Sequence, residues 1–244
     1  MHRDQTSRST APRRRIGRRA TAAVVLGTAL AAVSAPGIAS AHVGPHESGN
    51  ATVVLTRQST GATAATDSSA AELRAALTAL LQEHVYLAGI ATGTALSGGE
   101  LGPPAAALDQ NSMGLADAIG SVYGDAAGES FLALWRKHIQ FFVDYTTATA
   151  TGNAAAKAKA VADLDAYRSD FGAFLESANP NLPKEAVAGE LKPHVATLFA
   201  AIDAQATKDP SQYEKLRIAA SHMPMTAKIL AAGIATQFPK KFKR

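Results

Sequence analysis

The chain of 244 residues contains no cysteine, only 6% aromatic residues and a single tryptophan. The absence of cysteine excludes disulfide bonds, thiolate zinc sites, iron–sulfur clusters, c-type haem and a cysteine nucleophile. Beyond residue 41 no apolar run reaches the roughly 18 residues that a membrane-spanning helix needs. The remaining residues, about 200 in number, are enough for one sizeable core.

Several catalytic motifs are also missing. The sequence has no Gly-x-Ser-x-Gly, no phosphate-binding Walker loop and no His-Glu-x-x-His. No histidine has a carboxylate three residues before it, which excludes the Glu-x-x-His pattern of di-iron bundles. These absences favour a binding or structural protein over an enzyme.

The formal net charge of +4 comes from the N-terminus. Residues 1–41 hold seven arginines and one acidic residue, so 17 basic and 19 acidic residues remain after them. The rest of the chain therefore carries a net charge of −2. The basic pI does not indicate a nucleic-acid partner.

Residues 1–41 have the pattern of a signal peptide. A basic stretch at 13–19 precedes an apolar run at 20–38 and the small residues Ala39-Ser40-Ala41, a cleavage pattern. The paired arginines suit either the general secretory or the twin-arginine route. We expect a protein that is secreted or held at the cell surface.

Cleavage after Ala41 would place His42 at the new N-terminus, with His46 four residues later. The α-amine and these two imidazoles offer nitrogen ligands of the kind that Cu(II) prefers, so they form a candidate second metal site. The alternative is an end of the chain with two unrelated histidines. Residues 42–68 are rich in Ser, Thr, Ala and Gly, which is typical of a flexible leader.

From Ser69 the apolar periodicity predicts an all-α domain over residues 69–239, followed by a basic tail at 240–244. Ser69 and Glu72 have the spacing of a capping box at the first helix. Pro224 lies inside the sixth helix and should kink or split it. The six predicted helices span residues 69–96, 105–123, 129–150, 154–178, 184–208 and 211–237.

The six helices form a weak internal repeat of three helical hairpins, each of about 55 residues. His84, His138 and His194 occupy equivalent positions on the first helix of each hairpin, with separations of 54 and 56 residues. The second helices align as well, and their ends fall at residues 122–124, 178–180 and 237–239.

Each of these histidines lies on an apolar helix face, where a ring without a polar partner costs a few kcal/mol. Two interpretations remain open. Either each ring bonds a polar neighbour such as Asp109, Asn111 or Asp165, or at least two rings converge on a metal ion.

The segment His222-Met223-Pro224-Met225 adds one imidazole and two thioethers within a helical turn. Imidazole together with thioether suits copper, particularly Cu(I), whereas methionine most often only fills gaps in a core. Haem b, held by a histidine and a methionine, is an alternative cofactor. The candidate ligands are His84, His138, His194, His222 and Met225.

Several strings make the chain similar to a known family over residues 70–238. The chain resembles exported helical proteins of Gram-positive bacteria that are often labelled copper-amine-oxidase-like, and this resemblance implies an association with copper. No tyrosine follows an asparagine and no His-x-His occurs, so the oxidase activity is not carried over. The strings are Leu81-Gln82-Glu83-His84, Ala107-Leu108-Asp109-Gln110-Asn111-Ser112, Ala118-Ile119-Gly120-Ser121-Val122-Tyr123-Gly124, Leu134-Trp135-Arg136-Lys137-His138-Ile139, Phe142-Val143-Asp144-Tyr145-Thr146, Ser177-Ala178-Asn179-Pro180-Asn181-Leu182-Pro183 and His222-Met223-Pro224-Met225.

The sequence thus predicts an exported, all-α bundle that binds a transition metal, with copper favoured, and that sequesters, buffers or delivers it. The alternatives are an extracellular structural or interaction module without a metal, and a haem b-binding bundle. The metal ion is the one partner that the pattern identifies.

The signal-peptide prediction can be checked by mass spectrometry of the protein recovered from the culture medium. We expect an N-terminal peptide that begins at His42, because signal peptidase cuts after the small-x-small pattern. A chain that keeps residues 1–41 would contradict this prediction and would also remove the second metal site, which needs a free amine on His42.

Overall fold

The computed structural model describes residue 66 and residues 68–242. The predicted signal peptide, almost all of the leader and the candidate site at His42 and His46 lie outside the described residues. No helix in the described part is both long and apolar enough to cross a membrane.

The described part of the chain is all-α, as predicted, and contains no strand. The predicted sixth helix is two helices that meet at His222. Pro224 lies in the first turn of the second one, where its missing N–H costs no hydrogen bond. The helices are α2 (Ser69–Leu96), α3 (Gly102–Tyr123), α4 (Asp125–Ala150), α5 (Ala154–Ala178), α6 (Lys184–Ala206), α7 (Gln212–Ser221) and α8 (Met223–Gln237).

Side chains and glycines define where these helices begin and end. The N-cap of α2 is Ser68, one residue before the predicted Ser69, and its hydroxyl accepts a hydrogen bond from Ala71 N at 3.3 Å. Asn153 caps α5 in the same way. Gly124 has φ +94° between α3 and α4, a conformation that glycine adopts without a steric penalty.

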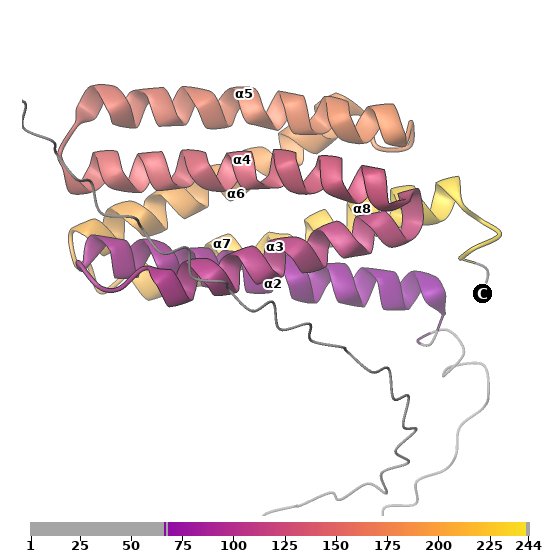
Figure 1. Ribbon diagram of the computed structural model, residues 1–244, viewed down its shortest axis with the longest axis horizontal. Coiled ribbons are helices and arrows are strands. Elements are labelled where there is room, and N and C mark those ends of the chain that lie inside the picture. Colours follow the sequence, from indigo (N-terminus) through magenta and orange to yellow (C-terminus); the bar gives the residue numbers. More distant parts are fainter. Residues whose placement is uncertain (1–65, 67, 243–244) are drawn as a thin grey trace, which may run out of the picture. The chain divides into compact units, whose positions relative to one another are not determined.

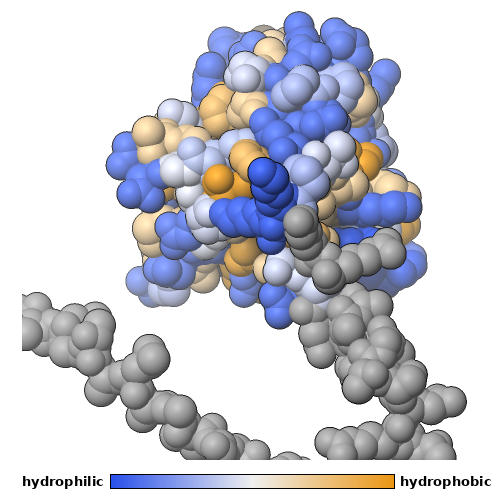
Figure 2. All heavy atoms as spheres, turned by 90° about the vertical axis from the view of Figure 1, so that its right-hand side faces the viewer, coloured by the Kyte–Doolittle hydropathy of each residue, from blue (hydrophilic) through white to orange (hydrophobic). Residues whose placement is uncertain are grey.

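The helices lie side by side along one axis, and each packs against its successor from α2 to α7 (Figure 1). Helix α8 packs mainly along α2, which also contacts α6 and α7. The end of the bundle in Figure 2 is mainly hydrophilic, with some apolar residues among the hydrophilic ones. Helix α2 is therefore the element that joins the beginning and the end of the domain.

The core has two apolar clusters. The larger one joins Leu77 and Val85 of α2 to Phe131 of α4 and Phe171 of α5. The smaller one joins Phe142 of α4 to buried residues of α5 and α6, and comprises Phe142, Tyr145, Ala160, Leu164, Leu198, Ala201 and Ile202. Burial of these side chains drives the packing of amphipathic helices that are individually marginal.

The C-terminal ends of α3, α5 and α8 are joined by hydrogen bonds. Asn179 Nδ2 donates to Tyr123 Oη at 3.0 Å, and Tyr123 Oη donates to Gln237 Oε1 at 2.9 Å. Gln237 Nε2 donates to the carbonyl of Ala178 at 2.8 Å. These are the helix ends that the internal repeat aligns, so the three equivalent ends meet at one end of the bundle.

Two glycines provide a test of this packing. Gly172 of α5 approaches α6 so closely that an added Cβ would lie 2.5 Å from Lys184 O, so Gly172→Ala should lower the free energy of unfolding by about 1–3 kcal/mol. Gly189 is exposed within α6 and has open space around it, so Gly189→Ala should raise stability by up to about 1 kcal/mol. Urea denaturation measures both; changes of the same sign would contradict the packing of α5 on α6.

Candidate functional site

The three histidines of the repeat are buried in the core, as their apolar helix faces predict. His84 of α2, His138 of α4 and His194 of α6 are 3%, 4% and 6% exposed. Each comes from the first helix of a different hairpin. The interhelical packing, and not the local sequence, therefore decides which of these rings meet.

Two of the rings are in direct contact. The Nε2 atoms of His84 and His138 lie 3.3 Å apart, and the ring planes are tilted by 50°. If no ion lies between them, one ring donates its Nε2–H and the other accepts, so the two neutral imidazoles must be opposite tautomers. The two Nε2 atoms therefore face each other, and the space between them belongs to both rings.

Aromatic side chains enclose this pair. The ring of Trp135 lies 4.9 Å from that of His84 and 4.4 Å from that of His138, measured between centroids. Tyr167 of α5 stacks on His138 at 5.1 Å, and Phe171 packs against Trp135 at 5.9 Å. The imidazoles therefore lie in an environment of low polarity.

Buried polar atoms without a partner gather around the same pair. In the part of the chain that the structure describes, six buried side-chain atoms make no hydrogen bond, whereas most buried polar atoms in proteins are paired. Such atoms call for a water molecule, an ion or a ligand. They are His84 Nδ1, His138 Nδ1, His194 Nδ1, Trp135 Nε1, Tyr167 Oη and Asn111 Oδ1.

His194 is a neighbour of the pair. It lines a cavity of about 20 Å³ together with His138, Trp135 and Tyr167. That volume exceeds the roughly 10–15 Å³ that one water molecule needs. The cavity therefore has room for a single water or ion between His138 and His194.

The four candidate imidazoles do not form one compact centre. Among residue 66 and residues 68–242, no three side chains of His, Asp or Glu are grouped closely enough to hold a metal ion together. His222 is half-buried at the junction of α7 and α8, and its electrostatic influence reaches His194. His84 thus contacts His138, His138 and His194 line one cavity, and His222 influences His194.

Burial keeps these imidazoles neutral. It lowers the pKa of His84 to about 3, with a further decrease from His194 and a smaller opposing effect of Asn111. Burial lowers the pKa of His194 to about 4, helped by His222. The pKa of His138 is well below its usual value, first because of burial and then because of the electrostatic effects of His84 and His194. The backbone of Trp135 has a smaller effect that raises this pKa. Neutral imidazole is the form that binds metals.

The predicted polar partners lie elsewhere, with one exception. Asp109 forms a bidentate ion pair with Arg136 on the surface at 2.7 and 2.9 Å, and Asp165 pairs with Arg168. Asn111 is buried, influences His84, and donates to Leu80 O at 3.0 Å and to Glu83 Oε2 at 2.8 Å.

Met225 was a candidate ligand because of its spacing from His222. Its side chain is 50% exposed on α8, outside the buried cluster. Met223, two residues earlier, is the buried one and belongs to the larger apolar cluster. The start of α8 therefore presents Met223 to the core and Met225 to solvent.

The sequence reasoning missed the aromatic enclosure of Trp135 and Tyr167. Trp135 lies three residues before His138, a spacing that puts both side chains on one helix face, so the contact between these two side chains could have been predicted from the sequence.

Comparisons with protein families, with curated proteins and with solved structures found no match. The residues themselves therefore carry the functional argument.

The neutral histidines predict a loss of stability in mild acid. In the unfolded chain they protonate near pH 6.5, whereas the folded chain resists protonation down to about pH 3 at His84 and about pH 4 at His194. The free energy of unfolding should therefore be flat above pH 6.5 and fall below it by about 1.4 kcal/mol per pH unit for each buried histidine.

Urea denaturation at pH 7.5, 6.0 and 5.0 measures this slope. His194→Leu should reduce the slope by the share of one histidine, about 1.4 kcal/mol per pH unit. Stability that stays constant between pH 6.5 and 5.0 would mean that the buried rings are not neutral.

Proposed function

We propose that this chain is an exported metal-binding protein that holds one copper ion, as Cu(I), between His84 and His138. Its role is to sequester, buffer or deliver copper outside the cytoplasm. The observation that carries the proposal is the buried contact of the two Nε2 atoms at 3.3 Å, surrounded by polar atoms that have no partner.

The distance between the two nitrogens fits an ion. Two imidazole nitrogens that each lie about 2.0 Å from a metal are separated by roughly 3.3 Å at a tetrahedral angle and by roughly 4.0 Å in the linear arrangement of an ion with two ligands. A metal can therefore take the place of the hydrogen bond between His84 and His138 when the two nitrogens, 3.3 Å apart, separate by less than about 1 Å. The ring that had donated its Nε2–H would then carry its proton on Nδ1 instead, so that both rings stay neutral and each offers Nε2 to the metal.

The charge of the surroundings favours a monovalent ion. Trp135, Tyr167 and Phe171 enclose the pair, and none of these side chains is anionic. The cost of burying an ion in a medium of low polarity rises with the square of its charge, so Zn²⁺ and Cu²⁺ would lack compensation here. Imidazole is a good ligand for copper, and Cu(I) carries a single charge.

Two alternatives to a copper ion between His84 and His138 are a metal-free structural or interaction module and a haem b centre. A structural or interaction module would use the hydrogen bond between His84 and His138 only to satisfy two buried rings. That reading draws on the same 3.3 Å contact. A haem b centre fits less well, because a macrocycle would have to separate rings that the packing holds together.

Copper binding can be measured in a mature chain that carries His42→Ala and His46→Ala, so that only the core site remains. We expect one Cu(I) per chain in a chelator competition under reducing conditions. Trp135 is the only tryptophan and contacts both imidazoles, so its fluorescence should be quenched on binding. His84→Phe combined with His138→Phe should abolish both signals, because both nitrogen ligands of the pair are removed and His194 alone does not form a two-ligand site.

The matched control is His222→Phe, which removes an imidazole outside the pair and should leave the stoichiometry unchanged. Circular dichroism checks that the double variant folds, and His84→Gln provides a milder change at the same position. Unchanged stoichiometry in the double variant would overturn the proposal. A parent chain that binds no Cu(I) would leave the metal-free interaction module in its place.

A further inference from the structure

A second and larger cavity is lined by His84. It has a volume of about 100 Å³ and lies among α2, α3, α4 and α6. Leu101 and Val143, which are 38% and 41% exposed, line its outer part, whereas His84 is almost completely buried. The cavity therefore extends from the protein surface to the imidazole of His84.

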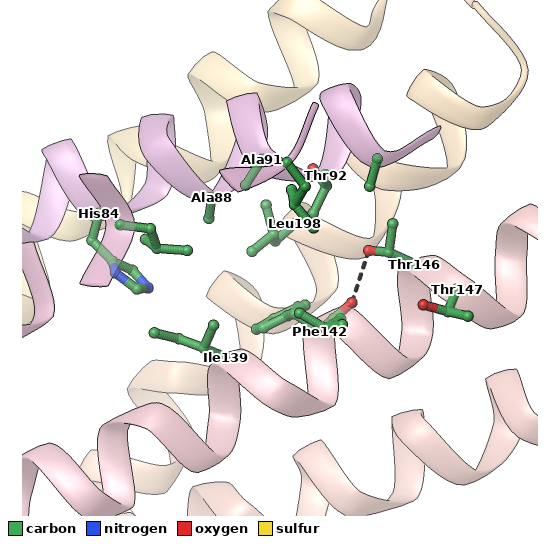
Figure 3. A pocket seen from close by; sticks show the side chains of 13 residues that line it. His84, Ala88, Ala91, Thr92, Ile139, Phe142, Thr146, Thr147 and Leu198 are labelled. Carbon is green, nitrogen blue, oxygen red and sulfur yellow. Dashed lines mark hydrogen bonds between the residues drawn. The ribbon is translucent and has the colours of Figure 1, made fainter. Parts of the chain in front are cut away.

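The wall of this cavity is almost entirely hydrocarbon. Figure 3 shows Ala88 and Ala91 on α2 facing Ile139 and Phe142 on α4, with Leu198 between them from α6. The residues that line it include no Asp, Glu, Lys or Arg. A charged ligand would lose its hydration here without compensation.

Two of the three threonine hydroxyls at the cavity are already hydrogen-bonded, and the third belongs to Thr147, which is exposed. Thr146 Oγ1 donates to Phe142 O at 2.7 Å, which is the dashed line in Figure 3. Thr92 Oγ1 donates to Gln205 Oε1 at 2.8 Å. His84 Nδ1, by contrast, makes no hydrogen bond within 3.5 Å, although the nearby Asn111 influences this ring, and His84 lines the cavity. The cavity thus combines an apolar wall with one buried polar atom that lacks a hydrogen bond.

We infer that this cavity binds a small, uncharged and mainly apolar molecule, of about the size of phenol, whose single polar group hydrogen-bonds His84. An apolar protein cavity of about 150 Å³ binds benzene, so a cavity of comparable size that opens to the surface admits a single ring. The small side chains of Ala88 and Ala91 create the space. This inference does not depend on copper, because the ligand uses Nδ1 of His84 and the metal uses Nε2.

The test uses the metal-free mature chain and three probes in calorimetric titrations. Phenol should bind saturably at one molecule per chain. Toluene has the same shape but cannot form the hydrogen bond, so it should bind about two- to tenfold more weakly. Benzoate, which is charged, should not bind. Equal affinity for phenol and benzoate, or no saturable binding of phenol, would overturn the inference.

Two variants locate the binding. Ala91→Leu should fill the cavity and reduce phenol affinity at least tenfold without lowering the unfolding midpoint, whereas Ala76→Leu, on the exposed side of α2, should leave affinity unchanged. His84→Phe should remove the preference for phenol over toluene. Unchanged affinity in Ala91→Leu would place phenol elsewhere and refute the site. Because the titrations contain no metal, a failure of copper binding leaves this result intact.

Discussion

The contact between His84 and His138 is the constraint on which the rest of the functional argument depends. Two polar rings lie in a region of low polarity, and each can satisfy only part of its hydrogen-bonding capacity there. A protein core gains more from well-packed hydrocarbon at such positions, so the rings lower the stability of the fold unless something binds to them. Their neutral state keeps a lone pair available, and it also makes the fold sensitive to acid.

Polar connections at both ends of the bundle hold the helices in register around that contact. At one end, Tyr123, Asn179 and Gln237 join α3, α5 and α8. Towards the other end, Gln205 of α6 donates to Gly89 O of α2 at 2.8 Å. A helix that slid by one residue would move its side chains by about 1.5 Å, which is enough to break a 3.3 Å contact. The distant hydrogen bonds therefore contribute to the geometry of the histidine pair.

His84 also connects two spaces that would otherwise be separate. Its Nε2 faces His138, and its residue forms the buried end of the apolar cavity that opens near Val143. Because both nitrogens belong to one ring, the tautomer that one partner selects changes what the other nitrogen offers. The proposed metal site and the proposed ligand cavity therefore share a single imidazole.

The sequence by itself determined the all-α fold, an interruption of the last helix beside Pro224 and the burial of the three repeat histidines, because helical periodicity and the missing N–H of proline act locally; whether that helix kinks or divides was left to the structure. Only the tertiary structure decided that His84 meets His138 while His194 stays a neighbour, and that Asp109 and Met225 lie on the surface. A helix face spans roughly 100° of the helix surface, so periodicity identifies the side that is buried. The rotation and offset of packed helices, which the whole core sets, then select the atoms that touch.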